Sequence, residues 1–338
     1  MNGEQSIPST LTEVRAELLR RIGREQMDFL HNEDRRLDLL AVLALAGLFT
    51  GGFVLVYQYP VWWVGLPVAV MQGLLITLLG LLNHDLFVHR GFGGKRGSLI
   101  WGTLLMAPAA LSFSQYRRAH LSHHLHVQSA EDPERYKSFI ASRARRLLFC
   151  TMIGLKLALK GAWTVPKEPY FAVDETVPKW LRTYEKVVHG LFLIGMLVLA
   201  YYSLPVFLYG YLIPVLIVTP SLNAIRILIE HAHIQSLGGL SIATYYRTGP
   251  ISRVMFFWDS GDCHVVHHIY ANIPFYRMSR ALEVFCPIFE DWGLKPIRSF
   301  GWLLNNWFVN LKPHGQDWLV SSEEIAASPP RPKVAGVS

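Results

Sequence analysis

The feature that most constrains this chain is a pair of long stretches without a single Asp, Glu, Lys or Arg. They run from Leu39 to His84, 46 residues, and from Val187 to Ile225, 39 residues. About 20 apolar residues cross the hydrocarbon core of a bilayer as one helix, so each stretch is long enough for two crossings. Only 17% of all residues are charged, against roughly 25% in an ordinary soluble domain. The sequence therefore predicts a multi-span membrane protein, and it argues against a soluble enzyme, a secreted disulfide scaffold and a disordered chain.

A proline beside aromatic residues divides each stretch into two helices. The first stretch breaks at Tyr57-Gln-Tyr-Pro60, and the second breaks near Tyr201-Tyr-Ser-Leu-Pro205. Tyrosine and proline at such points are typical of a turn at the membrane surface. We therefore expect an all-α membrane protein with four spans in two hairpins, at about 39–58, 61–83, 187–203 and 206–230.

Charge asymmetry predicts the orientation of these spans. The segment between the two hairpins is rich in Lys and Arg, whereas the turn within each hairpin has neither. The positive-inside rule places that segment in the cytoplasm, and two hairpins then leave both termini on the same side. Two shorter apolar runs, at 99–113 and 147–163, are expected to lie at the membrane interface or to dip into it.

The two ends of the chain are predicted to lie outside the spans. Thr10-Leu-Thr-Glu13 forms a capping box that opens a helix with Val14 and Leu18 on its apolar side. This helix could be a solvated surface helix, but one that lies on the membrane surface is favoured because a span follows soon afterwards. We expect an N-terminal cytoplasmic or interfacial region at 1–37, a membrane domain at 38–320 and a disordered tail at 321–338.

The histidines give the clearest indication of chemical function in this sequence. Most of the 14 histidines fall in four clusters just outside the predicted spans, and two of these clusters have the pattern HxxHH. On an α-helix, positions i, i+3 and i+4 present three imidazoles on one face, which can bind a metal ion. Chance would give roughly 0.02 copies of this pattern, so two copies are a strong signal. The two boxes are His120-Leu-Ser-His123-His124 and His264-Val-Val-His267-His268.

The other two clusters are less regular. His84 and His89 are five residues apart, which places their side chains about 140° apart on an α-helix. We therefore expect the helix to end between them, as the glycines from Gly91 onward permit, and we expect both to bind metal. In Glu230-His231-Ala-His233, the two histidines point in opposite directions if helical, so only one is expected to be a ligand. His231 is favoured, and His233 is the alternative.

These imidazoles are too many for one ion of four to six ligands, so the sequence implies two metal sites. Imidazole suits zinc, copper, nickel and iron, so ligation alone leaves the element open. Carboxylates beside the boxes, at Asp85, Glu230 and Asp262, are expected to orient metal-bound imidazoles by accepting their second N–H. The predicted ligands are His84, His89, His120, His123, His124, His231, His264, His267 and His268.

With these histidine boxes, the sequence resembles the family of integral-membrane fatty acid desaturases. The relatives of this family include the alkane hydroxylases and the carotenoid hydroxylases and ketolases. The similarity covers about residues 39–285. It rests on His84-Asp…His89, on the box from Tyr116 to His124 with Glu131-Asp-Pro133, and on the run from His264 to Tyr276. It implies a cytoplasmic cap that holds a di-iron centre, two Fe ions, with O2 as cosubstrate. Two features depart from the commonest pattern: four residues separate the first-box histidines, and His126 extends the second box.

The resemblance favours an O2-dependent desaturase that introduces a double bond into a long acyl or lipid-like chain. Hydroxylation or ketolation of a lipid or carotenoid by the same centre is the main alternative. A metal transporter or non-enzymatic metal-binding protein is a third possibility. It is disfavoured because the spans have no ionisable residue near the bilayer midplane, where transporters usually place them.

The expected partners are a membrane lipid or acyl substrate and a separate electron donor. Cys150, Cys263 and Cys286 are too dispersed for an iron–sulfur cluster, and the chain has no Gly-rich dinucleotide fingerprint. Electrons are therefore expected from a ferredoxin or cytochrome-type carrier and its reductase. Basic residues such as Arg117 and Arg118 could dock an acidic carrier or contact anionic headgroups. The net charge of +7 comes with no nucleic-acid-binding motif, so no nucleic acid partner is expected.

Overall fold

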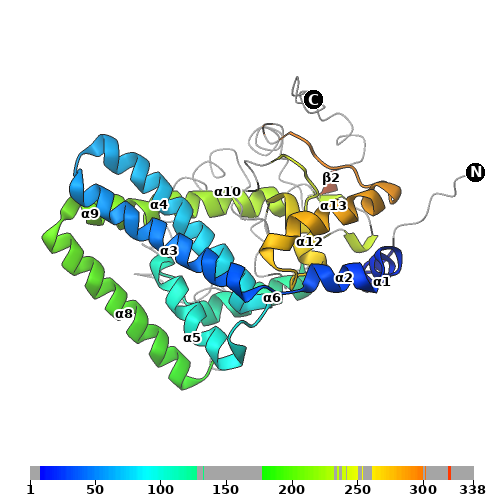
Figure 1. Cartoon of the computed structure of the whole chain (residues 1–338), viewed down its shortest axis with the longest axis horizontal. Coiled ribbons are helices and arrows are strands. Elements are labelled where there is room, and N and C mark those ends of the chain that lie inside the picture. Colours follow the sequence, from blue (N-terminus) through cyan, green and yellow to red (C-terminus); the bar gives the residue numbers. More distant parts are fainter. Residues whose placement is uncertain are drawn as a thin grey trace, which may run out of the picture. The chain divides into compact units, whose positions relative to one another are not determined.

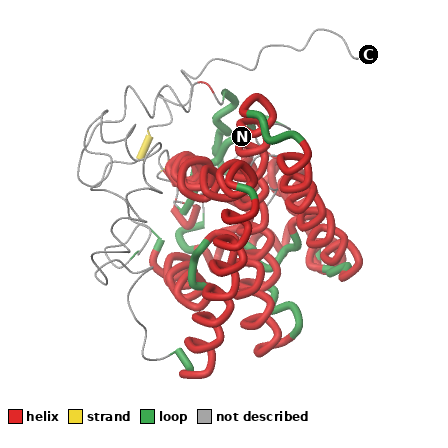
Figure 2. The backbone as a smooth tube through the Cα atoms, turned by 90° about the vertical axis from the view of Figure 1, so that its left-hand side faces the viewer, coloured by secondary structure: helices red, strands yellow, loops and turns green. Residues whose placement is uncertain are grey.

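The computed structural model describes residues 8–127, 132, 177–231, 234–235, 238–240, 242–249, 253, 261–299, 301 and 319–320. Helices make up most of this backbone (Figure 2). The chain divides into two compact units. We call one the terminal unit, which comprises Met1–Asn32, Ala141–Arg143 and Arg226–Ser338, and the other the membrane unit, which comprises Glu33–Ile140 and Ala144–Ile225.

The membrane unit contains the long apolar helices (Figure 1). Its elements are α3 (Arg35–Gln58), α4 (Trp62–Asn83), the π-helix η1 (His84–His89), α5 (Gly94–Met106), the 3-10 helix η2 (Ala107–Ala109), α6 (Phe113–His126), α8 (Lys179–Tyr202), α9 (Leu204–Phe207) and the π-helices η4 (Leu208–Leu212) and η5 (Pro214–Val218). Helix α10 (Thr219–His231) belongs to this unit up to Ile225 and to the terminal unit from Arg226.

Four helices in the described part of the chain are long and apolar enough to cross a membrane: Arg24–Gln58, Trp62–His89, Lys179–Tyr202 and Leu204–Asn223. The prediction of four spans in an all-α protein is therefore confirmed in number, but the bounds differ. Helix α8 begins at Lys179 rather than near 187, because a helix can continue through charged residues once it has left the hydrocarbon core. The fourth candidate span is Leu204–Asn223, and the helix continues beyond it as part of α10 to His231, close to the expected end near 230.

Helix α4 is the most buried of the four spans, whereas α3 and α8 expose apolar faces. Leu40 and Leu43 on α3 are about three-fifths exposed, as is Leu191 on α8. An exposed apolar face of this extent is typical of contact with lipid. Helix α4 also packs closely on η5, since a Cβ at Gly73 would overlap the side chain of Val218. Close backbone approach at small residues is typical of helix pairs in membranes.

The predicted dipping segment at 99–113 forms a bent pair of helices. Gly94–Ala109 and Phe113–His126 meet at 99°, and only together do they pass the same test of length and apolar composition. That geometry is typical of a broken span or a re-entrant loop. The second expected segment, 147–163, lies outside the described residues, as does the tail predicted to be disordered at 321–338.

The terminal unit is built around α13. Its elements are α1 (Leu11–Ile22), α2 (Arg24–His31), the strand β1 (Ile234–Gln235), the 3-10 helices η6 (Gly238–Leu240) and η7 (Gly261–Cys263), α12 (His264–Ile269), α13 (Phe275–Asp291) and the strand β2 (Leu319–Val320). The two short strands pair in parallel, with Ile234 opposite Leu319. The buried core brings together apolar residues of α1, α2, α12 and α13, such as Leu18, Leu30, Val266 and Phe289.

Helix α1 differs from its prediction in what it packs against. The capping box is confirmed, because the Glu13 backbone N–H donates to Thr10 Oγ1 and the Thr10 N–H donates to the Glu13 carboxylate, both at 3.2 Å. The expected interfacial helix would have turned its apolar face to lipid. Instead, Val14 and Leu18 are fully buried in the protein core. Residues of α12 and α13 cover the apolar side of α1, so this side does not indicate membrane contact.

The expected orientation can be tested with single cysteines introduced at two exposed sites. Lys95→Cys, at the start of α5, should react with a membrane-impermeant thiol reagent only from the cytoplasmic side, and Tyr59→Cys, in the α3–α4 turn, only from the opposite side. The parent chain, labelled in parallel, gives the background from native cysteines. Reaction of both sites from one face would contradict the predicted hairpin.

Candidate metal centre

The first histidine pair lies on the π-helix η1, which continues directly from α4. The Arg90 N–H donates to the Asp85 carbonyl, five residues back, at 3.1 Å. Our expectation that the helix ends between His84 and His89 is therefore wrong, since the helix widens here instead of ending. An i→i+5 turn brings residues five apart onto the same face. The Nε2 atoms of His84 and His89 lie 3.0 Å apart as a result.

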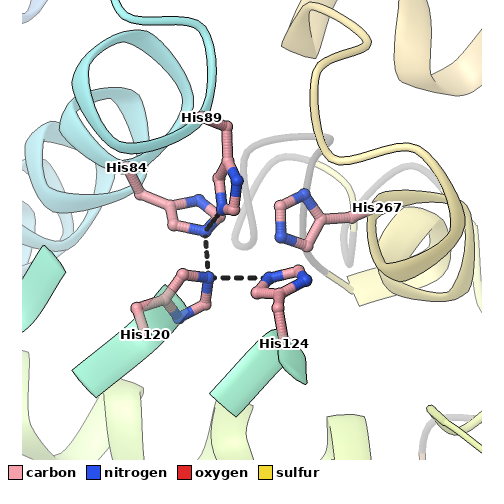
Figure 3. A group of neighbouring side chains, drawn as sticks. All are labelled: His84, His89, His120, His124 and His267. Carbon is pink, nitrogen blue, oxygen red and sulfur yellow. Dashed lines mark hydrogen bonds between the residues drawn. The ribbon is translucent and has the colours of Figure 1, made fainter. Parts of the chain in front are cut away.

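Helix α6 adds two imidazoles from the second box. His120 Nε2 lies 2.6 Å from His84 Nε2 and 2.9 Å from His124 Nε2. The ligand nitrogens of these histidines and His89 all lie within 4.8 Å of one another. Figure 3 shows these four rings, from η1 and α6, with their nitrogens turned toward a common point. We call these four residues the first histidine group.

The terminal unit brings a second set of histidine ring nitrogens close together. His231 ends α10, and His264 and His268 lie one turn apart on α12. His264 Nε2 lies 3.0 Å from His231 Nε2 and 3.1 Å from His268 Nε2. We call these three residues the second histidine group. The structure thus brings the favoured His231 to the third box, while the alternative His233 lies outside the described residues.

The nitrogen spacing in both groups fits metal coordination. A metal–nitrogen bond of about 2.1 Å places two ligand nitrogens at adjacent coordination positions about 3.0 Å apart. Most of the measured separations are 2.9–3.1 Å. A neutral imidazole has one N–H, so several Nε2 atoms that converge on one point suit a shared cation better than mutual hydrogen bonds. Burial, and then the surrounding imidazoles, lower the pKa of His120 well below its usual value, which keeps the ring neutral as a metal ligand must be.

The middle histidine of the second box is oriented differently. His123 is buried, and its Nδ1 donates to Asp132 Oδ1 at 2.8 Å. A carboxylate on Nδ1 is the usual support of an imidazole that binds metal through Nε2. His267 is buried at the corresponding position of α12. The additional His126 of the second box is exposed at the end of α6.

Two residues that the sequence analysis did not assign to the site hold the first pair in place. Arg90 makes two hydrogen bonds to each of Asp38, on α3, and Asp85, at 2.6–3.1 Å. All three side chains are at most 1% exposed. Burial opposes the charge on Arg90, but the charge of Asp85 and the hydrogen bonds to Asp38 outweigh it and raise the pKa of the guanidinium. Asp85, expected beside an imidazole, thus anchors η1 to α3 through Arg90.

A second anchor orients α6. The Glu185 carboxylate, on α8, accepts hydrogen bonds from the Ser114 N–H at 2.7 Å and from the Ser112 and Ser114 hydroxyls at 2.8 and 2.9 Å. These groups lie at the N-terminus of α6, where a carboxylate is favoured by the helix dipole. Tyr116 stacks on His120 one turn later, with ring centroids 5.7 Å apart. The sequence gives little indication of this role of Glu185, because the residue resembles an ordinary charged residue at the start of a span.

The remaining predicted carboxylates lie in the terminal unit. Asp262 accepts hydrogen bonds from the Thr248 N–H and hydroxyl and from the Gly249 N–H, at 2.8–3.0 Å. It therefore ties the start of the third box to the 242–249 segment. Glu230 Oε2 lies 3.7 Å from His264 Nε2. Burial, and then the charges of Glu230 and Asp262, raise the pKa of the Tyr246 hydroxyl well above its usual value.

The Arg90 anchor gives a stability prediction. Arg90→Ala leaves the carboxylates of Asp38 and Asp85 buried without their cation, which should lower the free energy of unfolding by about 3–5 kcal/mol. Arg20→Ala is the matched control, because the Arg20–Glu17 pair is exposed, and it should leave the unfolding midpoint nearly unchanged. Denaturant unfolding in detergent measures both variants. Equal midpoints for the two would show that the Arg90 network does not stabilise the membrane unit.

Comparison with known proteins agrees with this geometry. Residues 60–301 match the model of a family described as fatty acid desaturase. That region includes both histidine groups, η1 and the third box. No curated protein matches the chain. The match covers well over half of the residues, so the resemblance seen in the histidine boxes is confirmed, and the chain belongs to the fatty acid desaturase family.

Proposed function

We propose that this protein is an O2-dependent di-iron desaturase that introduces a double bond into a long acyl or lipid-like chain. The observation that carries the proposal is the pair of histidine groups, whose ring nitrogens are spaced about 3.0 Å apart as adjacent metal ligands would be. Family membership adds the reaction class, because it points to a lipid-modifying oxidoreductase that uses iron.

The position of the first group supports a lipid substrate. His84 and His89 lie at the end of the apolar helix Trp62–His89. A hydrocarbon chain held beside such a helix would reach the metal ligands without leaving an apolar environment, as most ligand sites require. We place both termini and the histidine groups on the cytoplasmic side, in line with the charge asymmetry of the connections.

In the proposed reaction, two adjacent CH2 groups lose one hydrogen each and become CH=CH. O2 accepts these two hydrogens together with two electrons and two protons, and two water molecules form. Iron held by the histidines would activate O2, which is the oxidant in this reaction. We propose that the two electrons come from a separate ferredoxin or cytochrome-type carrier, because the three dispersed cysteines of this chain do not fit an iron–sulfur cluster.

The residues of this chain would hold the iron ions and orient the imidazoles that bind them. The histidines of both groups would hold the iron ions, and Asp132 fixes the ring of His123 through Nδ1. The Arg90 network keeps η1 against α3, so that the two first-box imidazoles stay on one face. Burial of His84, His120 and His264 keeps bulk water from these nitrogens.

Metal content tests the ligand assignment. The purified protein should contain about two iron ions per chain, and His120→Ala and His264→Ala, one from each group, should each lower that content, since an open coordination position weakens binding. His31→Ala is the control, because His31 contacts the Met27 carbonyl, outside both groups. Elemental analysis of detergent-purified variants gives the result. Full iron content in His120→Ala or His264→Ala would contradict the assignment.

An oxygen-isotope assay tests the reaction. Protein reconstituted with an electron carrier, its reductase, 18O2 and candidate acyl lipids should form a new C=C bond without 18O in the lipid product. Mass spectrometry separates the outcomes. An 18O-labelled alcohol or ketone as the main product would identify a hydroxylase or ketolase instead, and turnover that continues without O2 would exclude both.

A further inference from the structure

The Glu230 carboxylate lies beside the ring nitrogens of the second histidine group. Its Oε2 is 3.7 Å from His264 Nε2, the same nitrogen that lies 3.0 Å from His231 Nε2. The ligand atoms of Glu230, His231 and His264 all lie within 4.8 Å of one another, and Glu230 is 2% exposed. The carboxylate thus faces the point on which the imidazoles converge.

The nitrogen that a carboxylate faces distinguishes a metal ligand from a supporting residue. A supporting carboxylate binds the nitrogen remote from the metal, as Asp132 does at Nδ1 of His123, at 2.8 Å. Glu230 instead faces the Nε2 atom that would bind the metal. Adjacent ligand atoms lie about 3.0 Å apart and opposite ones about 4.2 Å apart around an octahedral ion with bonds of about 2.1 Å. The 3.7 Å separation from His264 falls between these values.

The local structure holds the carboxylate in this position. Glu230 and His231 are the last two residues of helix α10. The Thr244 N–H donates to the Glu230 carbonyl at 2.7 Å, and the Gly261 N–H donates to Oε1 at 3.4 Å. Arg226, one turn earlier, lies 3.7 Å from Oε2. These contacts fix the end of α10 and balance the buried charge.

We propose that Glu230 is itself a metal ligand, which acts together with His231 and His264 of the second histidine group. This inference rests on the proposed function for the identity of the metal as iron, and it replaces the supporting role expected for Glu230 from sequence. Two histidines and one carboxylate with open positions are the ligand set of many non-haem Fe(II) oxygenases. The two metal positions are then unequal, because the first histidine group supplies neutral nitrogens and the second group adds one negative oxygen.

Titration of Fe(II) into metal-free, detergent-purified full-length protein under anaerobic conditions tests this assignment. The wild type should bind about two ions per chain. Glu230→Gln should retain one ion with unchanged affinity and bind the other at least tenfold more weakly, and ⁵⁷Fe Mössbauer spectra should change for one of the two iron components. Glu230→His should restore the second ion, because an imidazole can replace a carboxylate as an iron ligand, whereas the neutral amide of Gln is a weak ligand. Glu283→Gln, an exposed carboxylate on α13, is the matched control and should behave as wild type.

The outcomes separate this inference from the proposed function. If the wild type binds no iron, the proposed function fails. If the wild type binds two ions and Glu230→Gln binds both with equal affinity and an unchanged spectrum, only the ligand role of Glu230 is overturned. A second ion lost in Glu230→Gln but not restored in Glu230→His would also overturn that role and assign Glu230 to support of His264. If Glu230→Gln does not fold, the ⁵⁷Fe Mössbauer spectrum of Glu230→His decides: a change in one of the two iron components supports the ligand role, and an unchanged spectrum overturns it.

Discussion

The convergence of imidazole nitrogens at about 3.0 Å is the constraint on which the rest of this structure depends. Each neutral ring has one N–H and one lone pair, so a cluster of rings that all point Nε2 at one place cannot satisfy itself by hydrogen bonds alone. A shared cation can accept the lone pairs that these hydrogen bonds leave unused. The rings bind it best when the surrounding structure already holds them in position. The elements around both groups, the π-helix η1, the end of α10 and the short helix α12, provide that rigidity.

The ion network of Arg90 shows how the membrane unit stabilises an uncommon helical turn. A π-helical turn is costly for a chain that could continue as an α-helix, and such turns occur mainly at functional sites. Arg90 follows η1 immediately, and its guanidinium is buried between Asp85, within the turn, and Asp38, on α3. Loss of the turn would move Arg90 relative to Asp38, so the network stabilises the turn and the turn brings His84 and His89 together.

The sequence predicted the spans and the ligand types because both follow from local chemistry. A bilayer demands about 20 apolar residues per crossing, and the charge-free stretches provide four such segments. The π-helix could not be predicted, because it depends on the contact between Arg90 and Asp38, 52 residues apart in the chain. The supporting role of Glu185 was missed for the same reason, since its serine partners lie more than 70 residues away. The face of α1 was misassigned because amphipathic periodicity does not reveal whether protein or lipid covers the apolar side.

The geometry of HxxHH explains why each box contributes to its own group with two histidines and not three. On an α-helix, position i+4 lies about 40° to one side of position i and position i+3 lies about 60° to the other side, so i+3 and i+4 diverge by about 100° within one face. His120 and His124 therefore share one group, as do His264 and His268, with nitrogens 2.9 and 3.1 Å apart. The i+3 ring diverges from the i+4 ring, and Asp132 fixes the direction of His123 through Nδ1. The spacing of the box therefore allows one helix to turn two imidazoles toward one point and a third in another direction.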